Sequence, residues 1–184
     1  VDELCIQDIE ASKTGAEPNF ALLAEIATEA FMPLSYGGGV TSVEQVRRLF
    51  HIGFEKVVLN TVWQDHPEVM AEAASKFGSQ SIIASIDVRQ DLLRRNRCVT
   101  QCGTRVVDGT PVELAQKAEA LGAGEILLNS IDRDSAMQGY DLKLIQSVAE
   151  AVHIPVIACG GAGGAQDMKA ALQQAGAHAA AAGS

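Results

Sequence analysis

Polar residues follow directly on several short apolar runs, and two of them suit acid–base chemistry. Asp87 ends the apolar run 82–86, and Asp134 closes the segment Asp132-Arg133-Asp134 after another apolar run. A carboxylate held at the end of a strand can act as a general acid or base. For Asp87 the alternative is a purely structural role, and for Asp134 it is an ion pair with Arg133. We therefore take Asp87 and Asp134 as the candidate catalytic residues.

Glycines and neutral polar residues after other apolar runs form two candidate phosphate cradles. One combines Gly39 with Asn60 and Thr61, and the other combines Gly161 with Ser184. Glycines let backbone N–H groups approach an anion, while hydroxyl and amide side chains add donors. No Lys or Arg accompanies either group, so their donors would be mainly neutral. The alternative is that both groups are ordinary turns between a strand and a helix.

Three charged residues, Glu3, Lys56 and Glu125, stand at the starts of apolar runs instead of their ends. They are either solvated residues at the entry of each strand or members of a charged ring around one opening of a barrel.

The sequence has no pattern typical of a metal or cofactor site. The four His and four Cys lack the spacing of metal ligands, and Cys98 and Cys102 are too far apart for a Cys-x-x-Cys motif. We predict thiols in a reducing cytoplasm, no metal and no cofactor.

Charge and hydropathy disfavour several classes of partner. Fourteen Lys and Arg against 23 Asp and Glu give a formal charge of −9, whereas nucleic acid requires a basic surface. The short basic group at 94–97 is compatible with a solvated loop. The acidic charge leads us to expect no nucleic-acid partner. We find no run of 18 apolar residues and no signal-peptide pattern at the start, so we expect no membrane association and a cytoplasmic location.

The segments that position these residues alternate between strand and helix patterns. We expect seven strands, at 4–9, 33–36, 56–60, 81–87, 125–129, 155–159 and 179–182. We expect six helices, at 20–30, 41–51, 67–77, 110–121, 142–152 and 165–174. Capping boxes are predicted at Thr41 with Glu44 and at Thr110 with Glu113. Segment 88–109 is predicted as a long loop, with a hairpin as its alternative. Apolar strands separated by helices indicate a parallel sheet covered by helices.

The chain also resembles itself at an offset of 122 residues. The aligned segments include Met32-Pro33-Leu34 with Ile154-Pro155-Val156, Gly38-Gly39 with Gly160-Gly161, Asn19 with Asp141 and, after one inserted residue, Asn60-Thr61 with Gly183-Ser184. Two repeats of four βα units imply about 240 residues and a (β/α)8 TIM barrel. A doubly wound open sheet explains the alternation but not the repeat. Because the two cradles are related by the repeat, they predict one elongated substrate with two phosphates.

Against that repeat, residues 1–184 are expected to form a single (β/α)8-barrel domain that is incomplete at both ends. The repeat places one βα unit before Val1 and one helix after Ser184. A genuine seven-stranded protein is the alternative. Catalytic groups of such barrels lie at the carboxyl ends of the strands, which would bring Asp87, Asp134 and the two cradles to one mouth.

These motifs together resemble the cyclase subunit of imidazole glycerol phosphate synthase, over essentially the whole chain. The segments that carry the resemblance include Asp8-Ile-Glu-Ala-Ser12, Gly37-Gly-Gly39, Lys56-Val-Val-Leu-Asn-Thr61, Ser85-Ile-Asp87, Ser130-Ile-Asp-Arg-Asp134 and Ala158-Cys-Gly-Gly-Ala-Gly163. The resemblance implies a barrel that takes ammonia from a glutaminase subunit, closes the ring of imidazole glycerol phosphate and releases an aminoimidazole carboxamide ribotide. It thus implies a lyase of histidine biosynthesis with a glutamine amidotransferase as partner.

The resemblance also implies a role for each candidate residue. Asp87 matches one of two catalytic aspartates, the other lying on a strand before Val1, and Asp134 matches a strand-end aspartate near the second phosphate. The matches to the two phosphate sites are Gly39, Asn60 and Thr61 on one side, and Gly161 and Ser184 on the other. The matches to a charged gate at the ammonia entrance are Glu3, Lys56 and Glu125.

Departures from the family pattern leave the pathway open. Ser135 stands where the family usually has Gly, and Val58 and Cys159 replace positions often occupied by Ser. Segments such as 31–36 and 179–184 resemble a paralogous branch that works with an amidotransferase in amidating sugars of bacterial surface polysaccharides. A related two-phosphate isomerase barrel is disfavoured by the 130–134 motif and the gate residues. A non-catalytic remnant that binds phosphates or a partner subunit is the remaining alternative.

Overall fold

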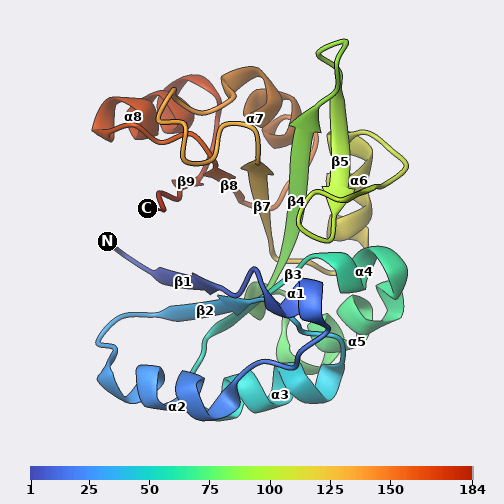
Figure 1. Ribbon diagram of the computed structural model, residues 1–184, viewed down its shortest axis with the longest axis vertical. Coiled ribbons are helices and arrows are strands. Elements are labelled where there is room, and N and C mark those ends of the chain that lie inside the picture. The colour runs from blue at the N-terminus through green and yellow to red at the C-terminus, as the bar shows by residue number, and fades with distance from the viewer. Residues whose placement is uncertain (184) are drawn as a thin grey trace.

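A curved parallel sheet forms the centre of the fold. The structure, a computed structural model, describes residues 1–183, apart from the side chains of residues 12 and 13. The parallel strands are β1 (Leu4–Gln7), β2 (Leu34–Gly37), β3 (Lys56–Leu59), β4 (Ile82–Gln90), β7 (Glu125–Ser130), β8 (Val156–Cys159) and β9 (Ala179–Ala180). They pair in that order, each parallel to the next. Within the described residues, β1 and β9 are the two edges, and the chain ends lie on either side of the opening between them (Figure 1).

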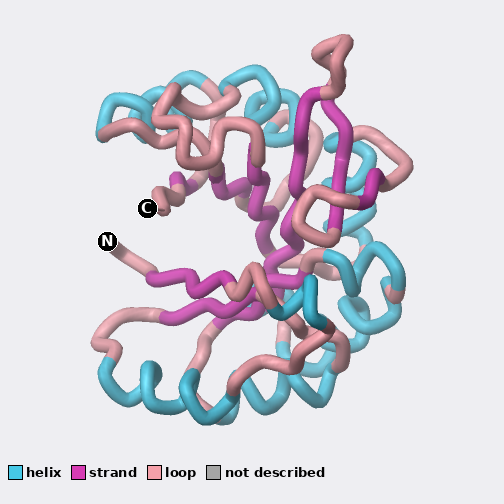
Figure 2. Tube along the Cα trace, in the orientation of Figure 1, coloured by secondary structure: helices cyan, strands magenta, loops and turns pink. Residues whose placement is uncertain are grey.

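Helices connect the strands and cover the outer side of the curved sheet (Figures 1 and 2). The longer helices are α2 (Phe20–Glu29), α3 (Val43–His51), α5 (Pro67–Phe77), α6 (Pro111–Ala120), α7 (Leu142–Ala149) and α8 (Ala165–Gln174). The shorter ones are α1 (Ala11–Thr14), α4 (Thr61–Asp65) and the 3-10 turn Ser79–Ser81. Parallel strands joined by outer helices and curled around one axis confirm the predicted α/β TIM-barrel class.

The internal repeat of 122 residues is confirmed by the positions of the elements. Strand β2, shifted by 122, gives the bounds of β8, and α3 shifted by 122 begins where α8 begins. Asn19 and Asp141 cap equivalent helices, because Asn19 Oδ1 accepts from Leu22 N at 3.2 Å and Asp141 Oδ1 accepts from Leu144 N at 3.1 Å. The two repeats are therefore equivalent in structure as well as in sequence.

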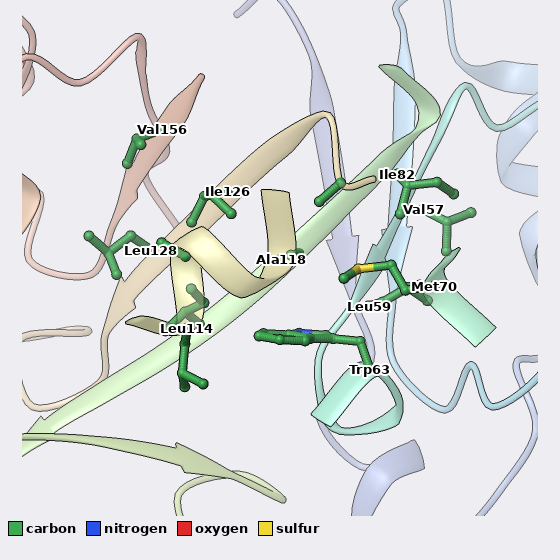
Figure 3. Packing of buried hydrophobic residues seen from close by; sticks show 14 of the residues in the cluster. Val57, Leu59, Trp63, Met70, Ile82, Leu114, Ala118, Ile126, Leu128 and Val156 are labelled. Atoms are coloured by element: carbon green, nitrogen blue, oxygen red, sulfur yellow. The ribbon is translucent and has the colours of Figure 1, made fainter. Parts of the chain in front are cut away.

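Alternation along the strands gives the sheet two apolar faces. The outer face packs against the helices in a large core (Figure 3), which includes Val57, Leu59, Trp63, Met70, Ile82, Leu114, Ala118 and Ile126. The inner face carries a smaller cluster of Val58, Ile83 and Leu127, with Ile157 and Cys159 packed against it. Trp63 is fully buried, and its Nε1 donates a hydrogen bond to the Ser85 carbonyl at 3.2 Å.

Two local predictions need correction. Helix α3 is capped by Ser42, whose Oγ accepts from Gln45 N, while Gln45 Oε1 accepts from Thr41 N at 2.7 Å. The predicted box of Thr41 with Glu44 is therefore wrong by one residue, because adjacent Thr and Ser can both cap and the Gln side chain decides between them. The box of Thr110 with Glu113 is confirmed.

The segment after β4 is a hairpin instead of a plain loop, as the alternative prediction had it. Strand β4 continues to Gln90 and pairs antiparallel with β5 (Asn96–Thr100), which pairs with β6 (Arg105–Val106). The basic group at 94–97 lies at its exposed tip, where Asp91 accepts hydrogen bonds from Arg95 and Arg97. These ion pairs account for Arg95 and Arg97 without a ligand.

Candidate active site

Asp87 lies near the carboxyl end of β4, between polar residues of the two neighbouring strands. Asn60, directly after β3, donates from Nδ2 to Asp87 Oδ2 at 2.8 Å. Asn129 of β7, which is in register with Asp87, donates from Nδ2 to Asp87 Oδ1 at 3.2 Å. Each carboxylate oxygen of Asp87 thus accepts one amide N–H.

The surroundings of Asp87 perturb its protonation. Burial raises the pKa of Asp87 above its ordinary value, and the nearby charge of Asp134 raises it further. The hydrogen bonds from Asn60 and Asn129 act in the opposite direction, because they stabilise the charged form. A carboxyl group under such opposing influences is suited to exchanging protons with a ligand.

Asn129 was not among the candidates from the sequence, although a signal for it exists. It is the first polar residue after the apolar run Ile126-Leu127-Leu128, as Asp87 is after its own run. The same criterion of a polar residue at a strand end would have found both.

Asp134 lies in the loop after β7, where its Oδ1 accepts from Ser135 N at 3.1 Å. Arg133 donates from Nη1 to the Gly139 carbonyl at 3.0 Å, and no ion pair between Arg133 and Asp134 is found within residues 1–183. The alternative reading of Asp134 as an ion-pair partner of Arg133 is therefore not supported. Ser135 has a φ of 59°, in the left-handed region that explains why glycine suits this position.

The first predicted cradle lines a cavity of about 400 Å³ at the ends of β2 and β3. Gly39, Asn60 and Thr61 all border it. Gly39 has a φ of 65°, and a Cβ there would lie 2.6 Å from the Ala16 carbonyl oxygen, so only glycine fits. Thr61 Oγ1 accepts from Gln101 N at 3.3 Å, which links the cavity to the hairpin.

The charges around this cavity are acidic or neutral. Its described lining includes Glu17 and Asp65 but no Lys or Arg. Asp65 is paired with Arg105 Nη2 at 2.6 Å, and Glu17 accepts from Gln45 Nε2 at 3.1 Å. An anion bound here would be held mainly by neutral donors, as the sequence predicted.

The second predicted cradle is described only in part. Gly161 follows β8, and its carbonyl oxygen accepts from Gly139 N at 2.7 Å, so this turn packs on the loop after β7. Ser184 lies outside the described residues.

The three predicted gate residues do meet, at the opposite end of the strands. Lys56 Nζ lies 2.8 Å from Glu3 Oε2 and 2.9 Å from Glu125 Oε1, and all three side chains are partly buried. Burial alone would lower the pKa of Lys56, but the hydrogen bonds to the two glutamates more than offset it, so the pKa is raised. The three side chains therefore form one ion cluster at the strand starts, and their role as a gate stays a prediction.

The described residues offer neither a metal site nor a membrane-spanning helix. Within residues 1–183, no group of three or more His, Cys, Asp and Glu side chains could hold a metal ion. The helices of that same part of the chain are too short or too polar to span a bilayer.

Comparison with known proteins gives a consistent set of relatives. The family model described as "Histidine biosynthesis protein" matches residues 1–184. The "Putative imidazole glycerol phosphate synthase subunit hisF2" of Pseudomonas aeruginosa is 46% identical over 91% of this chain and 67% of its own length. The "Imidazole glycerol phosphate synthase subunit HisF" of Myxococcus xanthus is 44% identical over 97% of this chain and 70% of its own length.

Proposed function

Because this chain belongs to the histidine biosynthesis protein family, we propose that it is an ammonia-dependent cyclase of the imidazole glycerol phosphate synthase type. In this proposal it is a lyase that forms imidazole glycerol phosphate with ammonia from a glutamine amidotransferase subunit. Residues 1–184 belong to one barrel domain, and the enzyme works in the cytoplasm.

The observation that carries the proposal is the order of side chains along the inner face of the sheet. The ion cluster of Glu3, Lys56 and Glu125 lies at the strand starts, and Asp87 lies near a strand end. Between them, the inner face carries the apolar cluster around Ile83. An apolar layer is crossed more readily by neutral ammonia than by a charged ion, because a buried charge is costly. This order supports delivery of ammonia from one end to chemistry at the other.

In the proposed reaction Asp87 acts as a general acid or base, and Asp134 supports it. The raised pKa of Asp87 favours this role, because its protonated form becomes accessible at a higher pH than for an ordinary aspartate. Asp134 lies close enough for its charge to affect Asp87.

The substrate is proposed to be an elongated molecule with two phosphates. One phosphate would occupy the cavity at Gly39 and Thr61, held by backbone N–H groups and the Thr61 hydroxyl. Asn60 also borders that cavity, but its side-chain N–H is engaged by Asp87, which leaves its backbone for the phosphate. The second phosphate would lie at Gly161 and Ser184.

A direct assay tests this function. The natural full-length protein is supplied with the open-chain precursor of imidazole glycerol phosphate and ammonium salt, and formation of the ring product is measured. Turnover that is lost in Asp87→Asn supports the proposal. Absence of turnover in the wild type, with the glutaminase subunit added, would contradict it.

A second candidate is amidation of a surface-polysaccharide sugar by the paralogous branch. The observation that favours it is Ser135, whose left-handed backbone stands where the family usually has a glycine that would be free of strain. The same assay separates the two, since efficient turnover of the histidine-pathway substrate excludes the paralogous function. Binding of a phosphate or a glutaminase without any turnover would instead point to the non-catalytic alternative.

A further inference from the structure

We propose that Asn129 is a positioning residue for Asp87: together with Asn60 it holds the ionised carboxylate in a fixed orientation, ready to accept a proton. The inference deepens the proposed function, because it rests on Asp87 as the acid–base group. It assigns Asp87 the resting role of base, and it gives a role to a residue outside the phosphate and gate motifs.

Asn129 is placed for this role by strand register. β4 and β7 are parallel neighbours, and Asp87 is the register partner of Asn129. On the other side of β4, Asn60 follows β3 and reaches the second carboxylate oxygen. Since the two amides come from different neighbouring strands, rotation of the Asp87 carboxylate would break at least one of their hydrogen bonds.

The direction of both amides indicates a negatively charged partner. Asn60 Oδ1 and Asn129 Oδ1 are buried and have no hydrogen-bond partner within the described residues, while both Nδ2 atoms point to Asp87. A buried polar atom without a partner costs about 1–3 kcal/mol, and hydrogen bonds to a charged group are stronger than neutral ones. A protonated Asp87 would instead donate its O–H to one of the two amides, and that amide would then turn its carbonyl oxygen towards Asp87.

The turn after β8 keeps the Asn129 amide in place. A Cβ added to Gly160 would lie 2.9 Å from Asn129 Oδ1, so this glycine leaves space for the amide oxygen and little more. The amide is thus packed on the side away from Asp87.

The charged and titratable groups that face Asp87 make the amide donors necessary. Asp134, in the loop after β7, raises the pKa of Asp87 by its charge, and Cys159 of β8 is also close enough to interact with it. No Lys, Arg or His within residues 1–183 forms an ion pair with Asp87, so its negative charge is stabilised by hydrogen bonds from Asn60, Asn129 and Ser85. Removing one of the two amide donors should therefore raise the pKa of Asp87.

The test is an NMR titration of the Asp87 side-chain carboxyl carbon in the natural full-length protein without substrate. Asn129→Leu, which keeps the size but removes the donor, should raise the pKa of Asp87 by about one unit. Asn96→Leu, on the hairpin, is the control and should leave the titration unchanged. An unchanged Asp87 pKa in folded Asn129→Leu would overturn the proposal.

A second measurement needs no variant, so it tests the hydrogen bond from Asn129 to Asp87 even if Asn129→Leu does not fold. In the wild type, the side-chain N–H signals of Asn129 should shift with pH at the same midpoint as the Asp87 carboxyl. If the chemical shifts of the Asn129 side-chain N–H groups do not change around this midpoint, the proposal is also refuted. Both readouts are independent of turnover, so their failure is distinct from failure of the proposed reaction.

Discussion

Asn60 and Asp87 connect the ends of two neighbouring parallel strands through a hydrogen bond of 2.8 Å between Nδ2 and Oδ2. Asn60 also borders the cavity at Gly39, so this bond links the candidate phosphate site directly to the candidate acid–base group. A ligand that moves Asn60 would alter the environment of Asp87. The two parts of the site are therefore expected to act together.

Replacing Asp87 by Asn should separate activity from stability. Turnover with free ammonia should fall by about 10²–10⁴ or more, since the acid–base group is lost. Because the folded pKa of Asp87 is raised, its stabilising contribution is full below the unfolded pKa and is lost as pH rises through the folded pKa. Because asparagine does not titrate, the stability of the variant relative to the wild type should therefore increase as pH rises, which urea unfolding followed by circular dichroism measures. Normal activity, or a relative stability that does not change with pH, would contradict this assignment.

Replacing Lys56 by Met should destabilise the protein and impair use of glutamine. The change leaves Glu3 and Glu125 facing each other, and we expect a loss of about 1–3 kcal/mol in the free energy of unfolding, between the values for exposed and buried pairs. Glutamine-dependent turnover should fall more than turnover with free ammonia. Lys76→Met, which breaks an exposed pair with Glu72, is the matched control and should cost less than about 0.5 kcal/mol.

The difference in stability between the wild type and Lys56→Met should depend on pH in a definite direction. The pKa of Lys56 is raised by folding, so the contribution of the cluster is fully present below the unfolded lysine pKa of about 10.4. It disappears as pH rises through the still higher folded pKa. Urea titrations of wild type and Lys56→Met should therefore converge at strongly alkaline pH, and a gap that persists there would argue against an ionic origin.

Ser135→Gly should stabilise the protein. The residue has a φ of 59°, which a serine adopts at a cost and a glycine does not, so we expect a gain of about 0.5–1 kcal/mol in urea unfolding. Ala136→Gly, at the next position, where φ is not positive, should instead lose stability through the greater freedom of the unfolded chain. Equal effects of the two changes would show that backbone strain is not the cause.

The two tyrosines should respond oppositely to loss of their hydroxyl groups. The Tyr36 hydroxyl is buried without a partner in the described residues, and burial raises the pKa of Tyr36 to about 12. The Tyr140 hydroxyl donates to the Ala181 carbonyl at 2.8 Å. Tyr36→Phe should therefore be neutral or stabilising by about 1 kcal/mol, whereas Tyr140→Phe should cost about 1–2 kcal/mol. Thermal unfolding of the two variants, compared with the wild type, measures both changes, and a loss in Tyr36→Phe would contradict the first.

Most of the fold was predictable because its strands and helices repeat. Apolar runs identified all seven parallel strands, and the offset of 122 residues matched β2 to β8. The short helices α1 and α4 were missed, since four or five residues show no helical periodicity. The hairpin was only an alternative, because its strands are polar and pair outside the parallel register.

The site was predictable where one residue type at a strand end carried the signal, as for Asp87. The ion cluster at Lys56 was less certain from sequence, because residues 3, 56 and 125 meet only through the curvature of the sheet. The position of Asn129 after an apolar run was visible in the sequence, but its contact with Asp87 depends on the register of β4 and β7, which the sequence alone does not reveal.

Trp63 gives the protein a fluorescent reporter in a useful place. It is the only tryptophan of the chain, its ring is fully buried, and its indole N–H is bonded to the carbonyl of Ser85, two residues before Asp87. It also lies two residues after Thr61 of the cavity. Intrinsic emission should therefore be blue-shifted in the native state and should change when a ligand rearranges the ends of β3 and β4, so that binding can be followed without an added dye.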